Sequence, residues 1–286
     1  MAFPTLGAQQ ETNRKILEDL QLKKQLLQKG VSPVQHQSIR YALITCTQMA
    51  IFFNAPVSQI NTTLGYFITQ DSYYGNTFIP LKKLEEYLQG VDVFEKPKIK
   101  LEQYVTPPHI ASCILYNIQV AIDGKLVGDL GCGSGMLSIG SFLLGAEMTI
   151  GFEIDADALD IFRSNVIEMD LPTVDCIQID VLQLSSKWVN TFDTIITNPP
   201  FGTKNNFGMD ISFVECGVRL ATDSVYSLHK STTRDYIKKK TSGWNVKGEV
   251  VAGLKYNIDA CYKFHKNKSV NVEVDLWRFD VEDKEI

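Results

Sequence analysis

Hydrophobic and polar residues follow one pattern in residues 1–80 and a different pattern afterwards. Residues 13–29 (NRKILEDLQLKKQLLQK) carry apolar side chains at helical spacing, Asn13 can cap the first turn, and Gly30 follows the last one. This pattern predicts one short amphipathic helix. Because such a helix is marginal in isolation, a lone solvated helix and a helix that docks on a partner are equally open.

Two further segments of this first part are rich in apolar and aromatic residues. Residues 41–53 (YALITCTQMAIFF) are apolar, and neither they nor any other run approaches the ~18 apolar residues of a membrane span. Residues 65–80 (GYFITQDSYYGNTFIP) are aromatic-rich, which is typical of a short motif that folds onto another protein. We therefore expect residues 1–80 to be a largely disordered extension with one short helix and no membrane contact.

In residues 81–286, strand-like and helix-like runs alternate. The strand-like runs are KLVGDLG, GAEMTIGFEID, CIQIDVLQL and FDTIITNPPFG, and the run MLSIGSFLLGA after the first of them is helix-like. Strands that alternate with helices predict a doubly wound α/β domain. The chain is therefore expected to contain two domains, residues 1–80 and residues 81–286.

Charge is divided unequally between the two parts. Residues 1–80 carry six Lys/Arg and four Asp/Glu, whereas the whole chain has a net charge of −5. The acidic second part argues against a generically basic nucleic-acid coat. Three basic clusters are candidates for RNA contact, although each is also typical of a solvated face. They are residues 229–240, residues 262–268 and the group Lys82, Lys83, Lys96, Lys98 and Lys100.

The cysteines indicate neither a metal site nor a disulfide framework. The chain has six cysteines and no two of them are spaced as CxxC, so a zinc ribbon or a redox motif is not expected. A domain of this size can bury a sufficient core without disulfides. The expected environment is therefore a reducing compartment, and no metal ligands are predicted.

A glycine-rich turn follows the first strand of the second part. Residues 131–135 read Gly-Cys-Gly-Ser-Gly, and glycine lets a backbone turn tightly and approach a ligand closely. The spacing differs from the dinucleotide pattern GxGxxG, because its third glycine comes one residue too early. Taken alone, the turn could also be an ordinary connection from a strand to a helix.

Acidic residues stand at the ends of the next two strands. Glu153 ends the second strand, where a carboxylate can accept both ribose hydroxyls of a nucleoside, and Asp180 ends the third, where it can accept the adenine amino group. Each residue alone is equally typical of a surface carboxylate or a helix cap. In series after the glycine turn, they indicate S-adenosylmethionine as the cofactor.

The fourth strand ends in Asn198-Pro199-Pro200-Phe201. The amine of an amide or of a base is a poor nucleophile because its lone pair is conjugated. The Asn198 side-chain oxygen and the Pro199 carbonyl can both accept hydrogen bonds from such an amine and orient it toward a methyl donor. Phe201 can stack on a base taken out of its helix. Pro200 stiffens the loop, and a simple strand-ending turn is the alternative.

Residues 81–286 closely resemble the methyltransferase-like protein 5 family of N6-adenosine methyltransferases. The resemblance is carried by LKKLEEYLQGVDVFEKPKIKLEQYVTPPHIA, VGDLGCGSGMLSIG, GFEIDADALDIF, FDTIITNPPFGTKNN, VYSLHKSTTR and YKFHKNKSVNVEVDLWRF. It implies a Rossmann-like seven-stranded fold and methylation of 18S ribosomal RNA, the RNA of the small ribosomal subunit. It also implies a small zinc-binding activator protein as partner and a location in nucleus and cytoplasm.

The same resemblance implies the site residues. The catalytic segment is Asn198 through Phe201. The cofactor-binding residues are Gln103, Thr106, Gly131, Ser134, Met136, Glu153 and Asp180. The surrounding QYVTPPH also predicts a helix start, with Thr106 as cap and Pro107 in the first turn.

Residues 1–81 resemble the SOSSC family, the small adaptor component of SOSS, a complex that senses single-stranded DNA. The matching stretches are MAFPTLGAQQETNRKILEDLQLKKQLL and GYFITQDSYYGNTFIPL, whereas residues 41–53 depart from that family. The resemblance implies an adaptor that joins an OB-fold single-stranded-DNA-binding protein to an integrator-type scaffold. Two alternatives to the rRNA enzyme therefore stand: an adaptor in the DNA damage response, or an amine methyltransferase acting on guanine N2, DNA adenine or protein glutamine.

Overall fold

The computed structural model describes residues 67–68, 77–202, 206–259, 269–282 and 284. The chain forms two compact units, Met1–Pro80 and Leu81–Ile286. In the first unit, β1 (Phe67–Ile68) pairs antiparallel with β2 (Thr77–Phe78). The predicted helix, the apolar run and the expected disorder of the extension lie outside the described residues.

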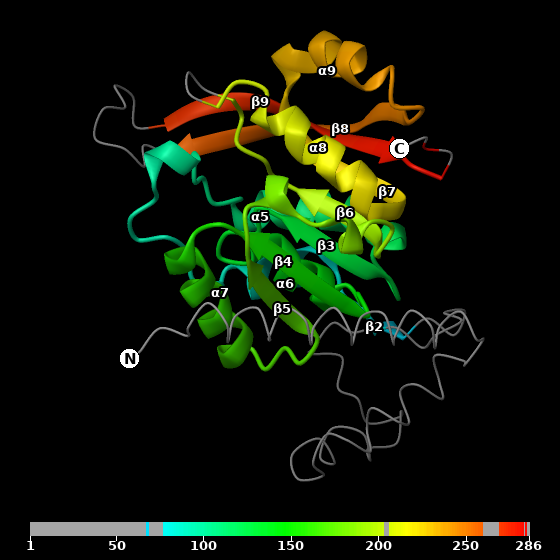
Figure 1. Ribbon diagram of the computed structural model, residues 1–286. Coiled ribbons are helices and arrows are strands. Elements are labelled where there is room, and N and C mark those ends of the chain that lie inside the picture. Colours follow the sequence, from blue (N-terminus) through cyan, green and yellow to red (C-terminus); the bar gives the residue numbers. More distant parts are fainter. Residues whose placement is uncertain (1–66, 69–76, 203–205, 260–268, 283, 285–286) are drawn as a thin grey trace, which may run out of the picture. The chain divides into compact units, whose positions relative to one another are not determined.

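The second unit contains a seven-stranded sheet in the order β5-β4-β3-β6-β7-β9-β8 (Figure 1). The strands are β3 (Leu126–Leu130), β4 (Met148–Glu153), β5 (Val174–Gln178), β6 (Phe192–Thr197), β7 (Ala221–Lys230), β8 (Lys247–Asp259) and β9 (Ser269–Asp280). From β5 to β7 the neighbouring strands are parallel, and β9 pairs antiparallel with both β7 and β8. This arrangement confirms the predicted Rossmann-like methyltransferase fold.

Helices cover the sheet as the alternating pattern predicts. They are α4 (Leu81–Leu88), α5 (Pro108–Asn117), α6 (Met136–Leu143), α7 (Ala156–Glu168), α8 (Met209–Leu220) and α9 (Arg234–Thr241), with short 3-10 turns η3 (Ile99–Leu101), η4 (Gln119–Ala121), η5 (Val181–Gln183), η6 (Ser186–Trp188) and η7 (Ser231–Thr233). Helix α6 packs against α4 and α5, α7 contacts β4 and β5, and α8 contacts β6 and β7 (Figure 1). No described helix is long and apolar enough to cross a membrane.

The register of the parallel strands determines where the site forms. Leu130 at the end of β3 lies opposite Phe152 on β4 and Thr197 on β6. The three strands therefore end at the same edge of the sheet, and the residues that follow them meet there. The apolar runs that predicted these strands are buried along their whole length in β3 and β4.

Close packing between the glycine turn and β4 leaves no space for a side chain at Gly151. A Cβ atom placed there would lie 2.6 Å from Cys132 Sγ, 2.9 Å from Cys132 Cβ and 3.0 Å from the Phe162 ring. Both Cys132 and Phe162 are buried, so neither can move aside without disturbing the core.

We expect Gly151→Ala to lower the free energy of unfolding by about 1–3 kcal/mol, because the added methyl group overpacks this contact. Gly253 on β8 is the matched control, because a Cβ atom there meets no other atom within 4 Å. Gly253→Ala should be neutral or slightly stabilising, since alanine suits a strand at least as well as glycine. Urea unfolding of both variants tests this, and equal effects of the two substitutions would contradict it.

Candidate functional site

A cavity of about 220 Å³ lies at the carboxyl ends of β3, β4 and β6. The segment 94–106, which precedes α5, contributes several residues to its wall. The cavity brings together all the predicted cofactor residues. From the Asn-Pro-Pro-Phe segment, Asn198 and Pro200 line it, whereas Pro199 and Phe201 do not.

The glycine turn has a backbone conformation that favours glycine at three positions. Gly131, Gly133 and Gly135 have φ angles of +73°, +54° and +96°, in the left-handed region that side chains rarely adopt. The Gly133 N–H points at the Glu153 carboxylate and donates to Oε2 at 3.1 Å. This hydrogen bond therefore ties the turn after β3 to the end of β4, and the backbone of the turn lies at the cavity wall.

Glu153 is held in place by backbone donors. Its Oε1 accepts hydrogen bonds from the backbone N–H groups of Ile154 and Asp155, each at 2.9 Å. Burial raises the pKa of Glu153, although these backbone hydrogen bonds oppose the shift. A carboxylate has about four acceptor positions, and three backbone donors use three of them, so Glu153 retains capacity for about one hydroxyl group in the cavity.

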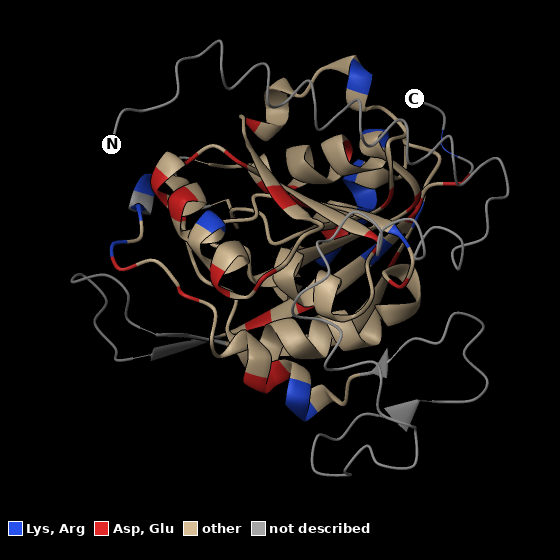
Figure 2. Ribbon diagram, turned by 90° about the horizontal axis from the view of Figure 1, so that it is seen from below, with Lys and Arg blue, Asp and Glu red and all other residues tan. Residues whose placement is uncertain are grey.

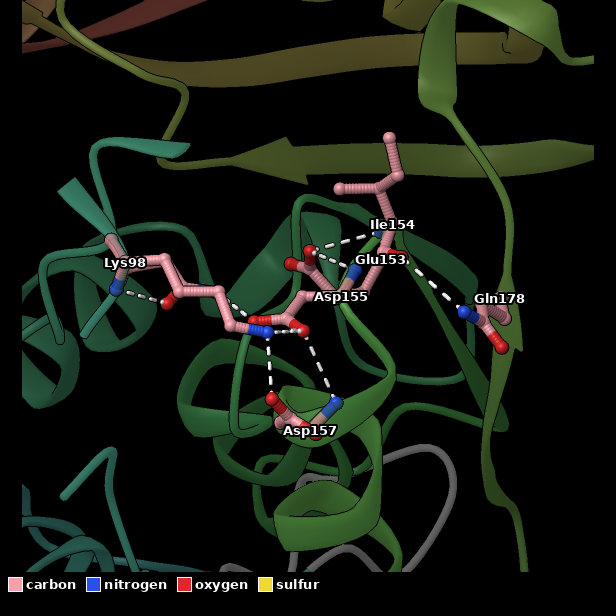
Figure 3. A network of polar contacts seen from close by, with 7 residues as sticks. Lys98, Glu153, Ile154, Asp155, Asp157 and Gln178 are labelled. Atoms are coloured by element: carbon pink, nitrogen blue, oxygen red, sulfur yellow. Dashed lines mark hydrogen bonds and ion pairs between the residues drawn. The ribbon is translucent and has the colours of Figure 1, made fainter. Parts of the chain in front are cut away.

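A polar network joins the 94–106 segment to the start of α7 (Figure 3). Lys98 Nζ lies 2.5 Å from Asp155 Oδ1 and 2.7 Å from Asp157 Oδ2. The Gln103 side chain accepts from the Lys98 backbone N–H at 2.8 Å and donates to Asp155 Oδ2 at 2.6 Å. Gln103 thus fixes the segment as well as lining the cavity.

Electrostatics supports the same network. Hydrogen bonds to Asp155 and Asp157 raise the pKa of Lys98. Burial tends to raise the pKa of Asp155, but the hydrogen bonds from Lys98 and Gln103 outweigh it and lower that pKa. Both groups are therefore charged around neutral pH, and the pair stays formed.

The other predicted cofactor residues have clear structural environments. Asp180 caps η5, because its Oδ1 accepts from the Leu182 N–H at 3.0 Å, while Asp180 also lines the cavity. Ser134 is buried in the glycine turn, and Met136 begins α6. Asp180 therefore both caps a helical turn and faces the cavity, so its predicted roles as a cap and as a cofactor ligand are compatible.

Thr106 differs from its predicted local role. The prediction of Thr106 as N-cap of the helix was wrong, because the N-cap position is Pro107 and α5 begins at Pro108. The Thr106 hydroxyl instead accepts a hydrogen bond from Asn198 Nδ2 at 2.9 Å. Thr106 therefore links the 94–106 segment to the loop after β6.

Asn198 presents an unused acceptor. Its Nδ2 also donates to the Tyr256 hydroxyl at 3.4 Å, whereas its Oδ1 is buried and has no hydrogen-bond partner in the described part of the chain. An unsatisfied buried acceptor costs about 1–3 kcal/mol, so a ligand that donates a hydrogen bond there is favoured. Asn198 also lines the cavity, so a ligand bound there is a candidate donor to this oxygen.

Phe201 lies in the same loop after β6, and its side chain is partly exposed. Its ring meets Tyr256 edge to face at a centroid distance of 6.5 Å, and Lys230 Nζ lies 5.8 Å from its centroid. A half-exposed aromatic ring with a nearby cation is suited to contact a base and its phosphate. Basic residues continue after Lys230 into α9, where Lys238, Lys239 and Lys240 lie in the last turn.

Two of the five lysines of the third predicted basic cluster form ion pairs. Lys98 is paired with two aspartates, and Lys83 is paired with Glu86 at 2.8 Å, so part of the positive charge of this cluster is offset within the chain. Figure 2 shows Lys and Arg interspersed with Asp and Glu along the described elements. Residues 262–268 lie outside the described residues.

Sequence reasoning missed one residue that bears directly on the cofactor. Asp129 lies buried on β3 and lines the cavity. Its Oδ2 accepts from Ser138 Oγ at 2.6 Å, but its Oδ1 has no hydrogen-bond partner among the described residues. S-adenosylmethionine carries an ammonium and a sulfonium group, so an uncompensated carboxylate beside the glycine turn fits this cofactor.

Two further features of the site could not be recognised from sequence patterns. Tyr256 stands in a β-strand with no motif around it, and the ion pair of Lys98 with Asp155 joins residues that are 57 positions apart.

A buried chain of Ser227, His229 and Asp210 has hydrogen-bond distances of 2.8 and 3.2 Å. None of these three residues lines the cavity, so they join β7 to α8 and do not form a nucleophilic site. No described group of His, Cys, Asp and Glu forms a metal site.

Asp129 generates a pH prediction for the cofactor-free protein. Burial raises the pKa of Asp129 from 3.8 to about 7, and the charge of Glu153 adds to the effect. The folded chain therefore keeps a proton that the unfolded chain has released. The stability from this proton is complete below the unfolded pKa and is lost as the pH rises to about 7.

We therefore expect wild type to lose stability relative to Asp129→Asn as the pH rises from about 4 to about 7, because asparagine does not ionise. Urea unfolding of both proteins at several pH values measures the difference. A difference that stays constant over this range would show that Asp129 does not hold its proton.

Family models match parts of both units of the chain. The family model for the methyltransferase small domain matches residues 110–219, and the SOSSC model, which describes a component of the SOSS complex, matches residues 53–82. The crystal structure of protein PH1948 from Pyrococcus horikoshii, a putative RNA methyltransferase by its description, is 32% identical, with a TM-score of 0.62, and covers 71% of this chain and 96% of that chain.

Two relatives match the two units separately. The rRNA N(6)-adenosine-methyltransferase Mettl5 of Drosophila melanogaster is 63% identical over 207 residues, covering 71% of this chain and 97% of that protein. The SOSSC homolog of Drosophila erecta is 47% identical over 107 residues, covering 30% of this chain and 83% of that protein. The chain is therefore an S-adenosylmethionine-dependent methyltransferase of the methyltransferase-like protein 5 family of rRNA N6-adenosine methyltransferases, with a SOSSC domain at its N-terminus.

Proposed function

We propose that this chain methylates the N6 amine of an adenosine in 18S ribosomal RNA, and that Asn198 holds that amine. The observation that carries the proposal is the buried Oδ1 of Asn198, which has no hydrogen-bond partner among the described residues and belongs to a residue that lines the cavity. The identity of 63% to an enzyme named for rRNA adenosine methylation supports the substrate class.

The residues of the cavity divide into a cofactor side and a substrate side. S-adenosylmethionine, when bound, supplies the electrophilic methyl group. Asp129, with its unpartnered oxygen, attracts positive charge, Glu153 accepts a ribose hydroxyl group, and Asp180 accepts an adenine amine. The glycine turn brings its backbone to the cavity wall without side chains.

On the substrate side, the chain acts by positioning an amine. Asn198 Oδ1 accepts one hydrogen of the N6 amine, and the Pro199 carbonyl, which lies outside the cavity lining without substrate, accepts the other when the base is bound. Holding both hydrogens directs the nitrogen lone pair toward the methyl donor and stabilises the positive charge that develops on nitrogen. Phe201 stacks on the extruded base, and Lys230 beside its ring contacts the adjacent phosphate.

The wider setting follows from the two resemblances. A small zinc-binding activator protein is proposed to stabilise the methyltransferase unit, and the chain is proposed to act in nucleus and cytoplasm.

The match of residues 53–82 to the SOSSC family supports a second function. Through this unit, the chain is proposed to contact an OB-fold single-stranded-DNA-binding protein and an integrator-type scaffold.

Substitution of two cavity residues separates methyl transfer from cofactor binding. We expect Asn198→Ala to reduce methyl transfer to 18S rRNA by about 100-fold or more, while the Kd for S-adenosylmethionine changes by less than about threefold. Asp180→Ala should mainly raise that Kd. The measurements are isothermal titration with the cofactor and transfer of labelled methyl to 18S rRNA, with the activator present. Equal losses of binding and transfer in Asn198→Ala would exclude the assigned role.

The adaptor function has its own test. We expect the full chain to bind an OB-fold single-stranded-DNA-binding protein of the SOSS type, and a peptide of residues 53–82 to compete for that binding. A peptide of the same composition in scrambled order is the control, because binding depends on the order of the aromatic residues. Competition by neither peptide, or by both peptides equally, would contradict a specific docking role.

A further inference from the structure

The orientation of the Asn198 amide decides whether the cavity offers an acceptor or a donor. The oxygen and nitrogen of an amide have almost the same shape, so only neighbouring donors and acceptors distinguish them. Nδ2 has two hydrogens, and it donates them to the hydroxyls of Thr106 and Tyr256 at 2.9 and 3.4 Å. This orientation leaves Oδ1 without a partner among the described residues.

The Tyr256 hydroxyl can serve Asn198 only as an acceptor. A phenol has one hydrogen, and Tyr256 donates it to the carbonyl oxygen of Val105 at 3.1 Å. A carbonyl cannot donate, so the direction of this hydrogen bond is fixed. The phenol oxygen therefore accepts from the Asn198 NH₂, and a reversed amide would place two acceptors against each other.

Thr106 cannot make the same distinction. Its hydroxyl can donate or accept, so it can pair with either end of the Asn198 amide. Tyr256 lies on β8, is 1% exposed, and does not line the cavity. Its ring also packs edge to face on Phe201, with an interplanar angle of 82°. Tyr256 is therefore placed to act on the substrate only through Asn198 and its loop.

We propose that Tyr256 is a positioning residue that fixes the Asn198 amide with its oxygen toward the target amine. This inference rests on the proposed role of Asn198 as an amine acceptor. The hydrogen donated to Val105 excludes the reversed amide. Without the hydroxyl, Thr106 can donate to Oδ1, and the Asn198 NH₂ then faces the NH₂ of the substrate. Two donors facing each other cannot hold the amine for transfer.

Tyr256→Phe in the full chain tests the proposal, because it removes the hydroxyl and keeps the ring. We expect kcat for methyl transfer to 18S rRNA to fall about tenfold, which corresponds to the loss of one buried hydrogen bond. The KM for rRNA and the Kd for S-adenosylmethionine should stay within about twofold. Tyr226→Phe on β7 is the matched control, because it removes another buried phenol hydroxyl and should leave kcat unchanged.

Two kinetic results would overturn the proposal. One is an unchanged kcat in Tyr256→Phe. The other is a loss of cofactor affinity as large as the loss of kcat, because that pattern indicates a general structural role. Thermal unfolding of Tyr226→Phe gives the stability cost of removing a buried hydroxyl, against which the unfolding of Tyr256→Phe is compared.

A second measurement needs no RNA. With ¹⁵N-labelled asparagine, the side-chain NH₂ hydrogens of Asn198 should exchange slowly in wild type and at least about tenfold faster in Tyr256→Phe, since one acceptor is lost. Unchanged exchange would overturn the proposal. If wild type methylates no rRNA, the proposed function fails, but this exchange measurement still decides whether Tyr256 fixes the amide.

Discussion

The common end of three adjacent parallel strands is the constraint on which the site depends. Since β4, β3 and β6 stop at the same edge of the sheet, the residues that follow each strand become neighbours. The glycine turn follows β3, Glu153 ends β4, and Asn198 follows β6. Chain segments separated by dozens of residues thus form one cavity, and the 94–106 segment completes its wall.

Two carboxyl groups of the site are buried away from bulk solvent and face the ligand cavity. Asp129 and Glu153 are both buried, and burial raises the pKa of each carboxyl. A cationic cofactor offsets the cost of their burial. The lysines also differ in their surroundings: Lys98 is paired with Asp155 and Asp157, whereas Lys230 lies beside Phe201. Under the proposed function, the local placement of Lys230, and not the net charge of the unit, provides the phosphate contact.

Much of the fold could be predicted because its signals are local. The buried runs of β3 and β4 and the glycine turn are visible in consecutive residues, and they correctly indicated a methyltransferase fold with its cofactor. Tyr256 and Asp129 could not be assigned in this way. The partners of Tyr256 lie 151 and 58 positions away, and Asp129 becomes notable only because one of its oxygens lacks a partner among the described residues. Thr106 was misjudged as a cap because the sequence does not reveal that its hydroxyl meets Asn198.

In the proposed function, the cavity holds an adenine amine from ribosomal RNA. The most direct measurement is to incubate the full chain with the activator, total RNA and labelled S-adenosylmethionine, to isolate 18S rRNA, and to digest it to nucleosides. We predict that the label appears as N6-methyladenosine in 18S rRNA. Label in N2-methylguanosine, or no label from a protein that binds the cofactor, would contradict this claim.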